Sequence, residues 1–245
     1  MSAGRALLGA AVLAALTLAG CQGQVNVPTS AVRGSGQVST ESRQVHGFHS
    51  VDLAGVATMT VKRGSTEALT VQAEDNLLPL LRTDVEGGVL RIGPRQGTAV
   101  APTKPIHYDL TASQLDALHV TGAATVDARD MNADQFRLEV TGASHVDLTN
   151  LATSSLTVDV TGAGAVKASG QATRQTVTIS GAGSYSAQDL SSQQATVEVS
   201  GSGDCAMRVS NSLSVSISGA GHVGYVGSPT VQQKISGLGS VTKTG

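Results

Sequence analysis

Residues Leu138–Asp147 read LEVTGASHVD, and Val158–Lys167, one step of 20 residues later, read VDVTGAGAVK. Each stretch has a Thr-Gly pair near its centre, and apolar and polar residues alternate on both sides of that pair. The Thr/Ser-Gly pair recurs at steps of 20, 20, 19, 20, 18 and 18 residues, beginning at Thr121, Thr141, Thr161, Ser180, Ser200, Ser218 and Ser236. A short and nearly fixed period is the sequence signature of a solenoid, in which each unit stacks on its neighbours.

The alternation around each pair predicts two strands per unit. The residue before each Thr/Ser is β-branched in every copy: Val120, Val140, Val160, Ile179, Val199, Ile217 and Ile235. Five positions after the Thr/Ser stands a second column, formed by Val126, Val146, Val166, Tyr185, Cys205, Val223 and Val241. Because successive side chains of a strand point to opposite faces, both columns are expected to face one buried interior. A shorter third side is expected around Met131, Leu151 and Leu190.

Stacking such units about 4.8 Å apart would pair each strand in parallel with its counterpart in the next coil. The glycine lets the chain turn where a Cβ would clash or φ is positive, and the small residue after it, such as Ala163, is expected in a crowded corner. Leucine-rich repeats share the period but need a helical or 3-10 return, and propeller blades need about 40 residues. The sequence therefore predicts an all-β fold, a single-stranded, right-handed parallel β-helix with coils of 18–20 residues.

An earlier copy of the unit is visible in Val51–Val61, when Ala54 is aligned with the Thr/Ser column. Residues 62–117 then break the period. This segment contains a hairpin-like turn at 63–65, a possible short helix around 77–81 and a second hairpin-like turn at 86–88. We expect it to be an irregular, elaborated N-terminal cap, because the end of a solenoid must be covered.

The N-terminus has the layout of a secretory signal, with one positive charge at Arg5 followed by an apolar run over 6–18. The run is too short to span a membrane. The tetrad Leu-Ala-Gly-Cys that ends at Cys21 resembles the lipobox of bacterial lipoproteins, which implies removal of residues 1–20 and a lipid on the Cys21 sulfur. An ordinary signal peptide with an incidental cysteine is the alternative. Gln22, unlike an Asp at this position, does not resemble an inner-membrane retention signal, so the outer membrane is the expected address.

Residues 21–43 contain Pro28 and many Gly, Ser, Thr and Gln, a composition that predicts a flexible tether between the lipid and a folded domain over 44–245. If Cys21 carries the lipid, only Cys205 remains, and no intramolecular disulfide is possible in the mature chain. Cys205 stands in an inward column, so we expect it to be a small buried hydrophobic residue rather than a reactive thiol.

Several motifs outside the strict repeat resemble one bacterial family. They are Phe48-His49-Ser50-Val51, Glu74-Asp75-Asn76-Leu77-Leu78, Gly87-Gly88-Val89-Leu90-Arg91-Ile92 and Gly224-Tyr225-Val226-Gly227-Ser228-Pro229. With these motifs, the stretch from about Val45 to Gly245 resembles the family described as putative auto-transporter adhesin, head GIN domain. The resemblance implies a β-helix associated with the bacterial envelope, without established catalytic residues. Leu238 departs from the pattern, since earlier copies have a small residue at its position.

Two pairs of acidic residues are expected one coil apart on the outer surface: Asp127 with Asp147, and Glu139 with Asp159. Stacked carboxylates repel each other, so each pair either stays solvated near a basic side chain or binds a cation such as Ca²⁺. These four residues are the candidates for metal ligands. The alternative, which we expect, is that both pairs stay solvated. His46 and His49 have the spacing of two zinc ligands, but no third and fourth ligand is evident. No cofactor is therefore predicted.

The composition limits the possible functions. The chain has 29 glycines, three Tyr, two Phe and no Trp, and its net charge is −2. A nucleic-acid partner would need a basic face, and a β-helical polysaccharide lyase or hydrolase would need clustered acids with aromatic platforms. We therefore expect a non-catalytic cell-envelope lipoprotein, an adhesin or surface-polymer-binding module without catalytic residues.

Two other functions stay open at this point. One is a structural or sensory envelope lipoprotein with a protein partner, and the other is a carbohydrate-active enzyme. The expected partners are the membrane, through the lipid anchor, and either a polysaccharide or another envelope protein. The sequence leaves the formation of homo-oligomers and the membrane face open.

Overall fold

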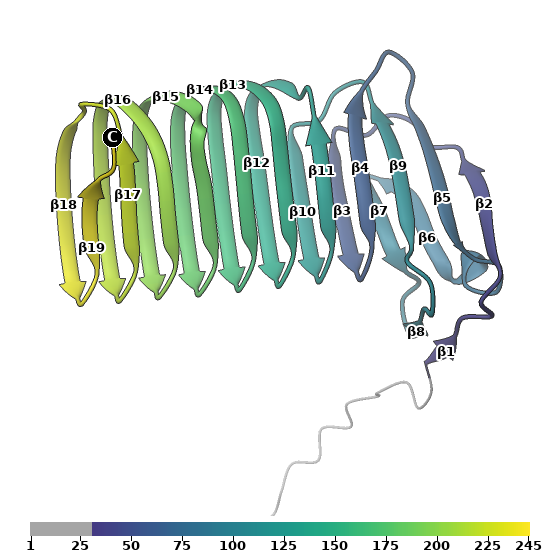
Figure 1. Cartoon of the computed structure of the whole chain (residues 1–245). Helices are drawn as coiled ribbons and strands as arrows, with labels where there is room; N and C mark the ends of the chain where they lie inside the picture. The colour runs from purple at the N-terminus through teal and green to yellow at the C-terminus, as the bar shows by residue number, and fades with distance from the viewer. Residues whose placement is uncertain (1–30) are drawn as a thin grey trace, which may run out of the picture.

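The computed structural model describes residues 31–245, which form a long solenoid of stacked coils with additional strands at its N-terminal end (Figure 1). The elements are β1 (Val32–Arg33), β2 (Val38–Arg43), β3 (Ser50–Gly55), β4 (Thr58–Arg63), β5 (Ala68–Glu74), the 3-10 helix η1 (Leu78–Leu80), β6 (Leu81–Glu86), β7 (Val89–Pro94), β8 (Val100–Ala101), β9 (His107–Ala112), β10 (Ala117–Gly122), β11 (Thr125–Arg129), β12 (Asn132–Gly142), β13 (His145–Gly162), β14 (Ala165–Gly181), β15 (Ser184–Gly201), β16 (Asp204–Gly219), β17 (His222–Val226), β18 (Thr230–Gly237) and β19 (Ser240–Lys243). No helix in this range is long and apolar enough to cross a membrane.

The Thr/Ser-Gly pairs are stacked along one side of the solenoid. Parallel pairing joins β10 to β12 and continues through β13, β14, β15 and β16 to β18, and at every step a Thr or Ser lies opposite a Thr or Ser. Val140, Val160 and Ile179 follow one another in an inward column and are at most 1% exposed. The predicted parallel β-helix, with its stacked inward columns, is confirmed.

Each coil has three sides. In the coil that runs through residues 157–175, residues 157–161 form the first side, residues 165–169 the second side and residues 171–175 the third side. The corresponding residues of neighbouring coils extend these sides along the whole solenoid. The interior is apolar apart from a few buried polar groups, such as the Tyr185 hydroxyl, which donates to Gln175 Oε1 at 2.7 Å.

Each coil turns at its glycine through a backbone conformation with positive φ. Gly162 has a φ of 104°, and a Cβ on it would stand 2.8 Å from the carbonyl oxygen of Gly142 in the preceding coil. The small residue after it, Ala163, is exposed, so the predicted crowded position is wrong by one residue. The crowded position is that of Gly164, where a Cβ would lie 2.7 Å from Val140 Cγ1. After the turn at Gly162, the first residue of the corner, Ala163, is exposed, and the second, Gly164, is buried.

The unit predicted in Val51–Val61 is also confirmed. β3 pairs in parallel with β10 and β4 with β11, and Ala54 lies opposite Thr121. The chain between these two coils therefore leaves the solenoid and returns to it. During this excursion β7 and β9 add a further parallel layer on the other side of β3 and β4.

Antiparallel strands close the N-terminal end beyond this layer: β6 pairs with β7, β5 with β9 and β2 with β5. The prediction of an irregular cap over 62–117 is wrong in that the cap consists of regular strands, which extend the sheets of the solenoid before they reverse direction.

The hairpin at 86–88 is confirmed, since Gly87 and Gly88, both with positive φ, connect β6 to β7. The turn at 63–65 forms no hairpin, because β9 lies between β4 and β5. The predicted short helix is the single turn η1.

The flexible tether predicted over 21–43 is too long. β1 pairs with β8, and β2 pairs with β5 along its whole length. Arg43 fixes the end of β2 by donating from Nη1 to the Leu81 carbonyl and from Nη2 to the Leu78 carbonyl, both at 2.7 Å. β2 has the composition of a loop because this outer strand is largely exposed on both faces and is therefore polar. Residues 21–30 lie outside the described part of the chain.

Candidate functional site

The acidic pair on the first side is bound by a basic side chain. Glu139 and Asp159 lie opposite each other in β12 and β13, as predicted. Arg137 donates from Nε to Glu139 Oε1 at 2.6 Å and from Nη2 to Asp159 Oδ2 at 2.7 Å. On its other side, Glu139 Oε2 lies 2.7 Å from His119 Nδ1. Partial burial opposes ionisation of Glu139, but the hydrogen bonds from Arg137 and His119 outweigh it and lower the pKa of the carboxyl.

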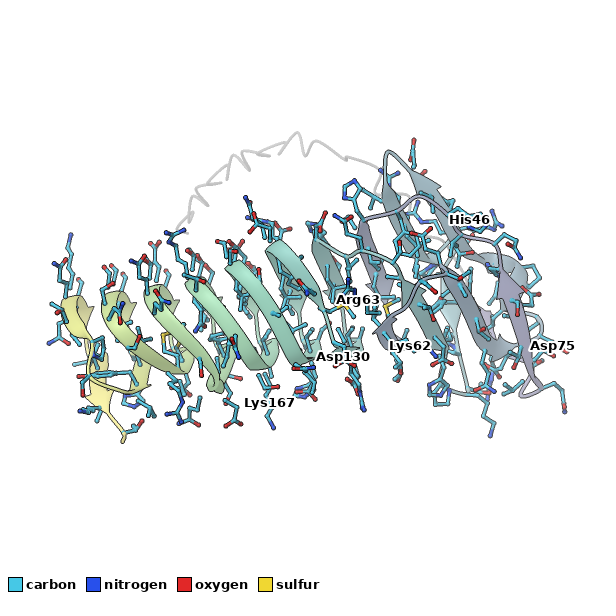
Figure 2. The ribbon with its side chains drawn as sticks, turned by 90° about the horizontal axis from the view of Figure 1, so that it is seen from above. His46, Lys62, Arg63, Asp75, Asp130 and Lys167 are labelled. Carbon is cyan, nitrogen blue, oxygen red and sulfur yellow. The ribbon has the colours of Figure 1, made fainter. Side chains whose placement is uncertain are left out.

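On the second side, only one acid of the pair is bound by an arginine. Asp127 and Asp147 lie opposite each other, and Lys167 follows Asp147 in the next coil. The Arg129 guanidinium hydrogen-bonds both carboxylate oxygens of Asp127 and lowers the pKa of this carboxyl. His145 Nε2 lies 3.3 Å from Asp147 Oδ2. Figure 2 shows Lys167 projecting outward from the solenoid, so two acidic residues are followed by one basic residue in this column.

The structure thus brings three of the four candidate acids, Glu139, Asp159 and Asp127, to an arginine, whereas in the described part of the chain Asp147 has only His145 nearby and its Oδ1 has no hydrogen-bond partner. Among residues 31–245, no group of three or more His, Cys, Asp and Glu side chains is placed to hold a metal ion. The partners Arg129 and Arg137 were missed in the sequence, although each stands two residues from an acid on the same face of its strand. That spacing could have identified both ion pairs.

The other predicted positions carry no site in the described structure. Cys205 is buried, and this burial raises the pKa of its thiol, in agreement with the expected apolar role. His46 and His49 are exposed, and the nearest acid recorded for His49 is Asp116, with 3.9 Å between Nδ1 and Oδ2. Cys21, the predicted lipidation site, lies outside the described residues.

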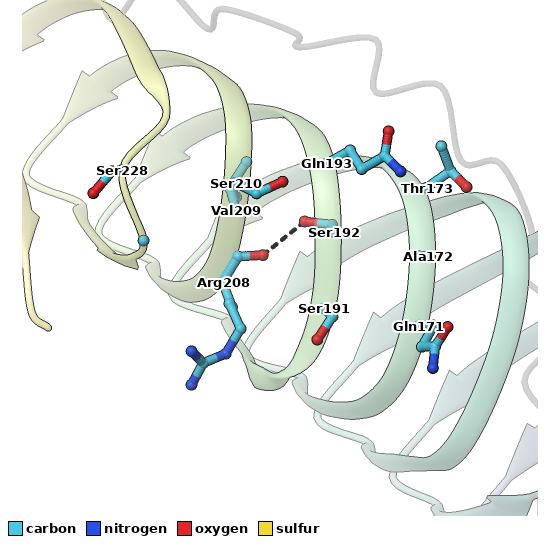
Figure 3. Close-up of a pocket in the computed structure, with 11 residues that line it drawn as sticks. Gln171, Ala172, Thr173, Ser191, Ser192, Gln193, Arg208, Val209, Ser210 and Ser228 are labelled. Atoms are coloured by element: carbon cyan, nitrogen blue, oxygen red, sulfur yellow. Dashed lines mark hydrogen bonds between the residues drawn. The ribbon is translucent and has the colours of Figure 1, made fainter.

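A hollow of about 590 Å³ opens on the third side, where the repeat shortens from 20 to 18 residues (Figure 3). The register between β15 and β16 shifts after Ala187 and again after Ser192, because the coil that follows Gly201 has fewer residues. The shorter coil leaves a depression between its neighbours. At its centre Ser192 Oγ donates to the Arg208 carbonyl at 2.7 Å, and Arg208 Nε donates to the Gln188 carbonyl at 2.9 Å.

Polar groups line this hollow. They are the hydroxyls of Thr173, Ser191, Ser210 and Ser228, the amides of Gln171 and Gln193, and the guanidinium of Arg208. Hydroxyl and amide groups both donate and accept hydrogen bonds, whereas the guanidinium only donates. The lining has no carboxylate, imidazole or thiol. The hollow can therefore hold a ligand rich in hydroxyl groups but offers no acid–base pair for catalysis.

A buried carboxylate fastens the N-terminal segment to the cap, and the sequence analysis missed it. Glu74 has no exposed surface and accepts hydrogen bonds from the Gly36 N–H at 2.6 Å, from the Thr103 N–H at 2.8 Å and from the Thr103 hydroxyl at 2.5 Å. The Thr103 hydroxyl contributes most to lowering the pKa of Glu74 to about 2. Asn76 adds a bond from Nδ2 to the Arg33 carbonyl at 2.8 Å. The start of the described chain is thus held at the capped end.

Comparisons with known proteins agree on the fold. The sequence matches the family described as "Putative auto-transporter adhesin, head GIN domain" over residues 47–229. Among solved structures, a putative adhesin from Bacteroides fragilis NCTC 9343 is similar, with a TM-score of 0.83 and 22% identity over 87% of this chain and 100% of that chain. A putative lipid binding protein from Parabacteroides distasonis ATCC 8503 has a TM-score of 0.75 and 20% identity over 88% and 100%. A putative adhesin from Parabacteroides merdae ATCC 43184 has a TM-score of 0.70 and 21% identity over 88% and 99%. None of the curated proteins matches this chain.

Proposed function

Since the chain belongs to the putative auto-transporter adhesin, head GIN domain family, we propose that it is a non-catalytic adhesion module that is anchored to the outer membrane by a lipid on Cys21 and binds a polysaccharide. The family description indicates a cell-envelope or surface protein. The lipid anchor is supported by the lipobox-like tetrad that ends at Cys21. Adhesion requires a binding surface on the solenoid, and the hollow on the third side is the best candidate.

The polar lining of the hollow is the observation that carries this proposal. A sugar presents closely spaced hydroxyls that donate and accept hydrogen bonds, and the side chains of Ser191, Gln193 and Ser210 can do the same. Arg208 adds one positive charge, which favours a polysaccharide with carboxylate groups, because guanidinium–carboxylate bonds are among the stronger ones. The hollow is open and lies on a straight side of the solenoid, so it can accept a segment of a long polymer.

The same lining argues against the enzyme alternative. Glycoside hydrolysis usually needs two carboxyl groups that flank the scissile bond, about 5 to 10 Å apart. The hollow has no carboxyl group, and three of the four stacked acids on the other two sides are bound to Arg129 or Arg137. A lipid ligand, as the description of the Parabacteroides distasonis protein suggests for that protein, would need an apolar pocket for its acyl chain. The apolar side chains that line the hollow, those of Ala172 and Val209, are at most 2% exposed and form no such pocket.

A structural or sensory lipoprotein with a protein partner is the second candidate. The observation in its favour is the last coil, where β18 and β19 pair with one strand each among the described residues. Such an edge can accept a strand from another protein.

Calorimetric titration of the Cys21→Ala chain with neutral and uronate-containing polysaccharides tests the proposed function. Binding should be tighter for the acidic polymers. The double substitution of Ser191 and Gln193 by Ala should weaken it roughly thirtyfold, because each of the two lost hydrogen bonds contributes about 1 kcal/mol. Thr196→Ala and Ser214→Ala, on the exposed first side, form the matched control and should leave the affinity unchanged. Equal affinities of both double variants would contradict the assignment of the hollow, and no binding to any polymer would contradict the function.

A further inference from the structure

The last coil of the solenoid is open at its outer edge. Among residues 31–245, β18 pairs only with β16, and β19 pairs only with β17. Ile235, which continues the column of Val160, is 38% exposed, and Leu238 is 91% exposed. In Figure 1 this coil lies at the opposite end from β2 and β5, which cover the N-terminal coils. A strand that is paired on one side only, as β18 is, has free backbone groups on its other side that can pair with a further strand.

The hydrogen-bonding pattern of β18 determines which backbone groups face outward. The Leu238 N–H donates to the Gly219 carbonyl in the preceding coil. Along a strand, the N–H and C=O groups of one residue point to the same side, and those of the next residue point to the other side. The backbone groups of Val231, Gln233 and Ile235 therefore face the free edge, and those of the residues between them face β16.

We propose that this edge pairs with the same edge of a second copy, β18 against β18 in antiparallel orientation about a two-fold axis at Gln233. Val231 of each copy then lies opposite Ile235 of the other, and Gln233 lies opposite itself. Because the backbone groups of these three residues face the free edge, each pair forms two backbone hydrogen bonds. A two-fold contact of this kind buries the same surface on both copies and is closed, so it does not grow into fibres.

The side chain of Gln233 has a role in this contact. In earlier coils its inward column is apolar, with Leu138, Val158, Val177, Val197 and Val215. A side-chain amide carries both a donor and an acceptor, so two Gln233 side chains can hydrogen-bond each other across the axis. A self-complementary polar pair within an apolar contact is a known means of fixing register.

The charge of Lys234 favours a two-fold axis at Gln233 over an axis at the next residue. An axis at Lys234 would preserve the backbone bonds and pair as many residues of β18. It would, however, place Lys234 of one copy directly opposite Lys234 of the other, and like charges in that position are destabilising. With the axis at Gln233, Lys234 faces the neutral Gln232 instead. The same register brings Leu238 near Ser228 and Pro229 of the second copy, which provides a neighbour for this exposed leucine.

A contact between the last coils of two copies bears directly on how the protein would mediate adhesion. Glu74 holds the start of the described chain at the capped end, so the described chains of two joined copies begin at opposite ends of one rod. Copies anchored in facing membranes would meet through their last coils, and the second copy is then the ligand. This inference depends on the proposed anchoring at Cys21 but not on polymer binding by the hollow.

Sedimentation velocity of the Cys21→Ala chain tests the pairing. The expected result is a concentration-dependent dimer. Gln232→Lys should weaken it roughly fivefold, because two like-charge pairs with Lys234 are created, and Gln232→Glu should strengthen it. Ser214→Lys, which lies opposite Gln232 in the preceding coil, is the matched control and should have no effect. A monomer at all concentrations, or equal effects of the two Gln232 substitutions, would overturn the proposal.

Crosslinking tests the register. In a hydrogen-bonded antiparallel pair the Cα atoms are about 5.5 Å apart, a distance that a disulfide can span. Gln233→Cys in the Cys21→Ala chain should therefore give a disulfide-linked dimer on oxidation, since Cys205 is buried and does not compete. Ser216→Cys, on the exposed face of the preceding coil, should stay monomeric. The absence of a crosslink at Gln233 would overturn the register. Loss of the dimer with unchanged polysaccharide titration would separate this proposal from the proposed function.

Discussion

Val160→Asp tests the stacked interior most directly. Val160 is 1% exposed and lies between Val140 and Ile179 in the neighbouring coils, both of which are also buried. Removing a buried valine side chain costs about 2 kcal/mol, and leaving a carboxylate buried without a partner costs several kcal/mol more. The side chains above and below are apolar and offer no basic group. The expected loss of at least about 5 kcal/mol is comparable with the whole stability of a domain, about 5–15 kcal/mol.

Thermal unfolding followed by circular dichroism measures this loss. We expect the midpoint of Val160→Asp to fall by at least about 10 °C. Thr161→Asp places the same carboxylate on the exposed neighbour and should change the stability by no more than about 0.5 kcal/mol. Burial raises the pKa of the introduced carboxyl, so the penalty should shrink as the pH falls toward about 4, where the unfolded chain also takes up the proton. Equal midpoints for the two Asp variants would refute the inward position of Val160.

Two further predictions concern the N-terminal end. The hydrogen bond from the Thr103 hydroxyl, with the backbone donors around it, lowers the pKa of Glu74 from 4.5 to about 2, so its stabilising effect is complete above pH 4.5 and is lost as the pH falls toward 2. Urea midpoints between pH 2 and 5 should show this slope, and a Glu74→Gln variant with the same slope would contradict the assignment. Cys21→Ala should move the protein from the membrane fraction to the soluble fraction, and its retention in membranes would rule out the lipid anchor.

The repeat itself could be predicted because its physical cause is local. The alternation of apolar and polar residues around each Thr/Ser-Gly pair indicates which side chains are buried. Val140 and Val160 both stand one residue before such a pair, and this shared position indicates that they stack. The cap could not be predicted in the same way. Its parallel layer depends on pairing of β7 with β3 and of β9 with β4, and no repeated pattern in residues 62–117 indicates these contacts. β2 was missed because an exposed outer strand lacks the alternation that marks a half-buried one.

The site was less predictable than the fold because it arises where the repeat changes. The sequence showed the steps of 18 residues, but only the register shifts after Ala187 and Ser192 show that the shorter coil creates a hollow on one side. The acids were expected to stack, and they do. The pairing of Asp127 with Arg129 and of Glu139 with Arg137 follows a two-residue spacing along the strand that the sequence analysis did not use.

A perfect repeat would give every coil the same surface, so no coil could bind differently from the next. Recognition by such a protein therefore requires departures from the repeat, and three of those in the described chain bear on the proposals made above. The shortened coil after Gly201 forms the polar hollow, Glu74 fixes the end near the predicted anchor, and Gln233 and Leu238 change the last coil. The first departure forms the hollow that is proposed as the ligand site. The other two distinguish the two ends of the described rod, a capped end and an end with an unpaired edge. With the anchoring proposed at Cys21, the end with the unpaired edge would face away from the membrane, where the proposed contact with a second copy forms.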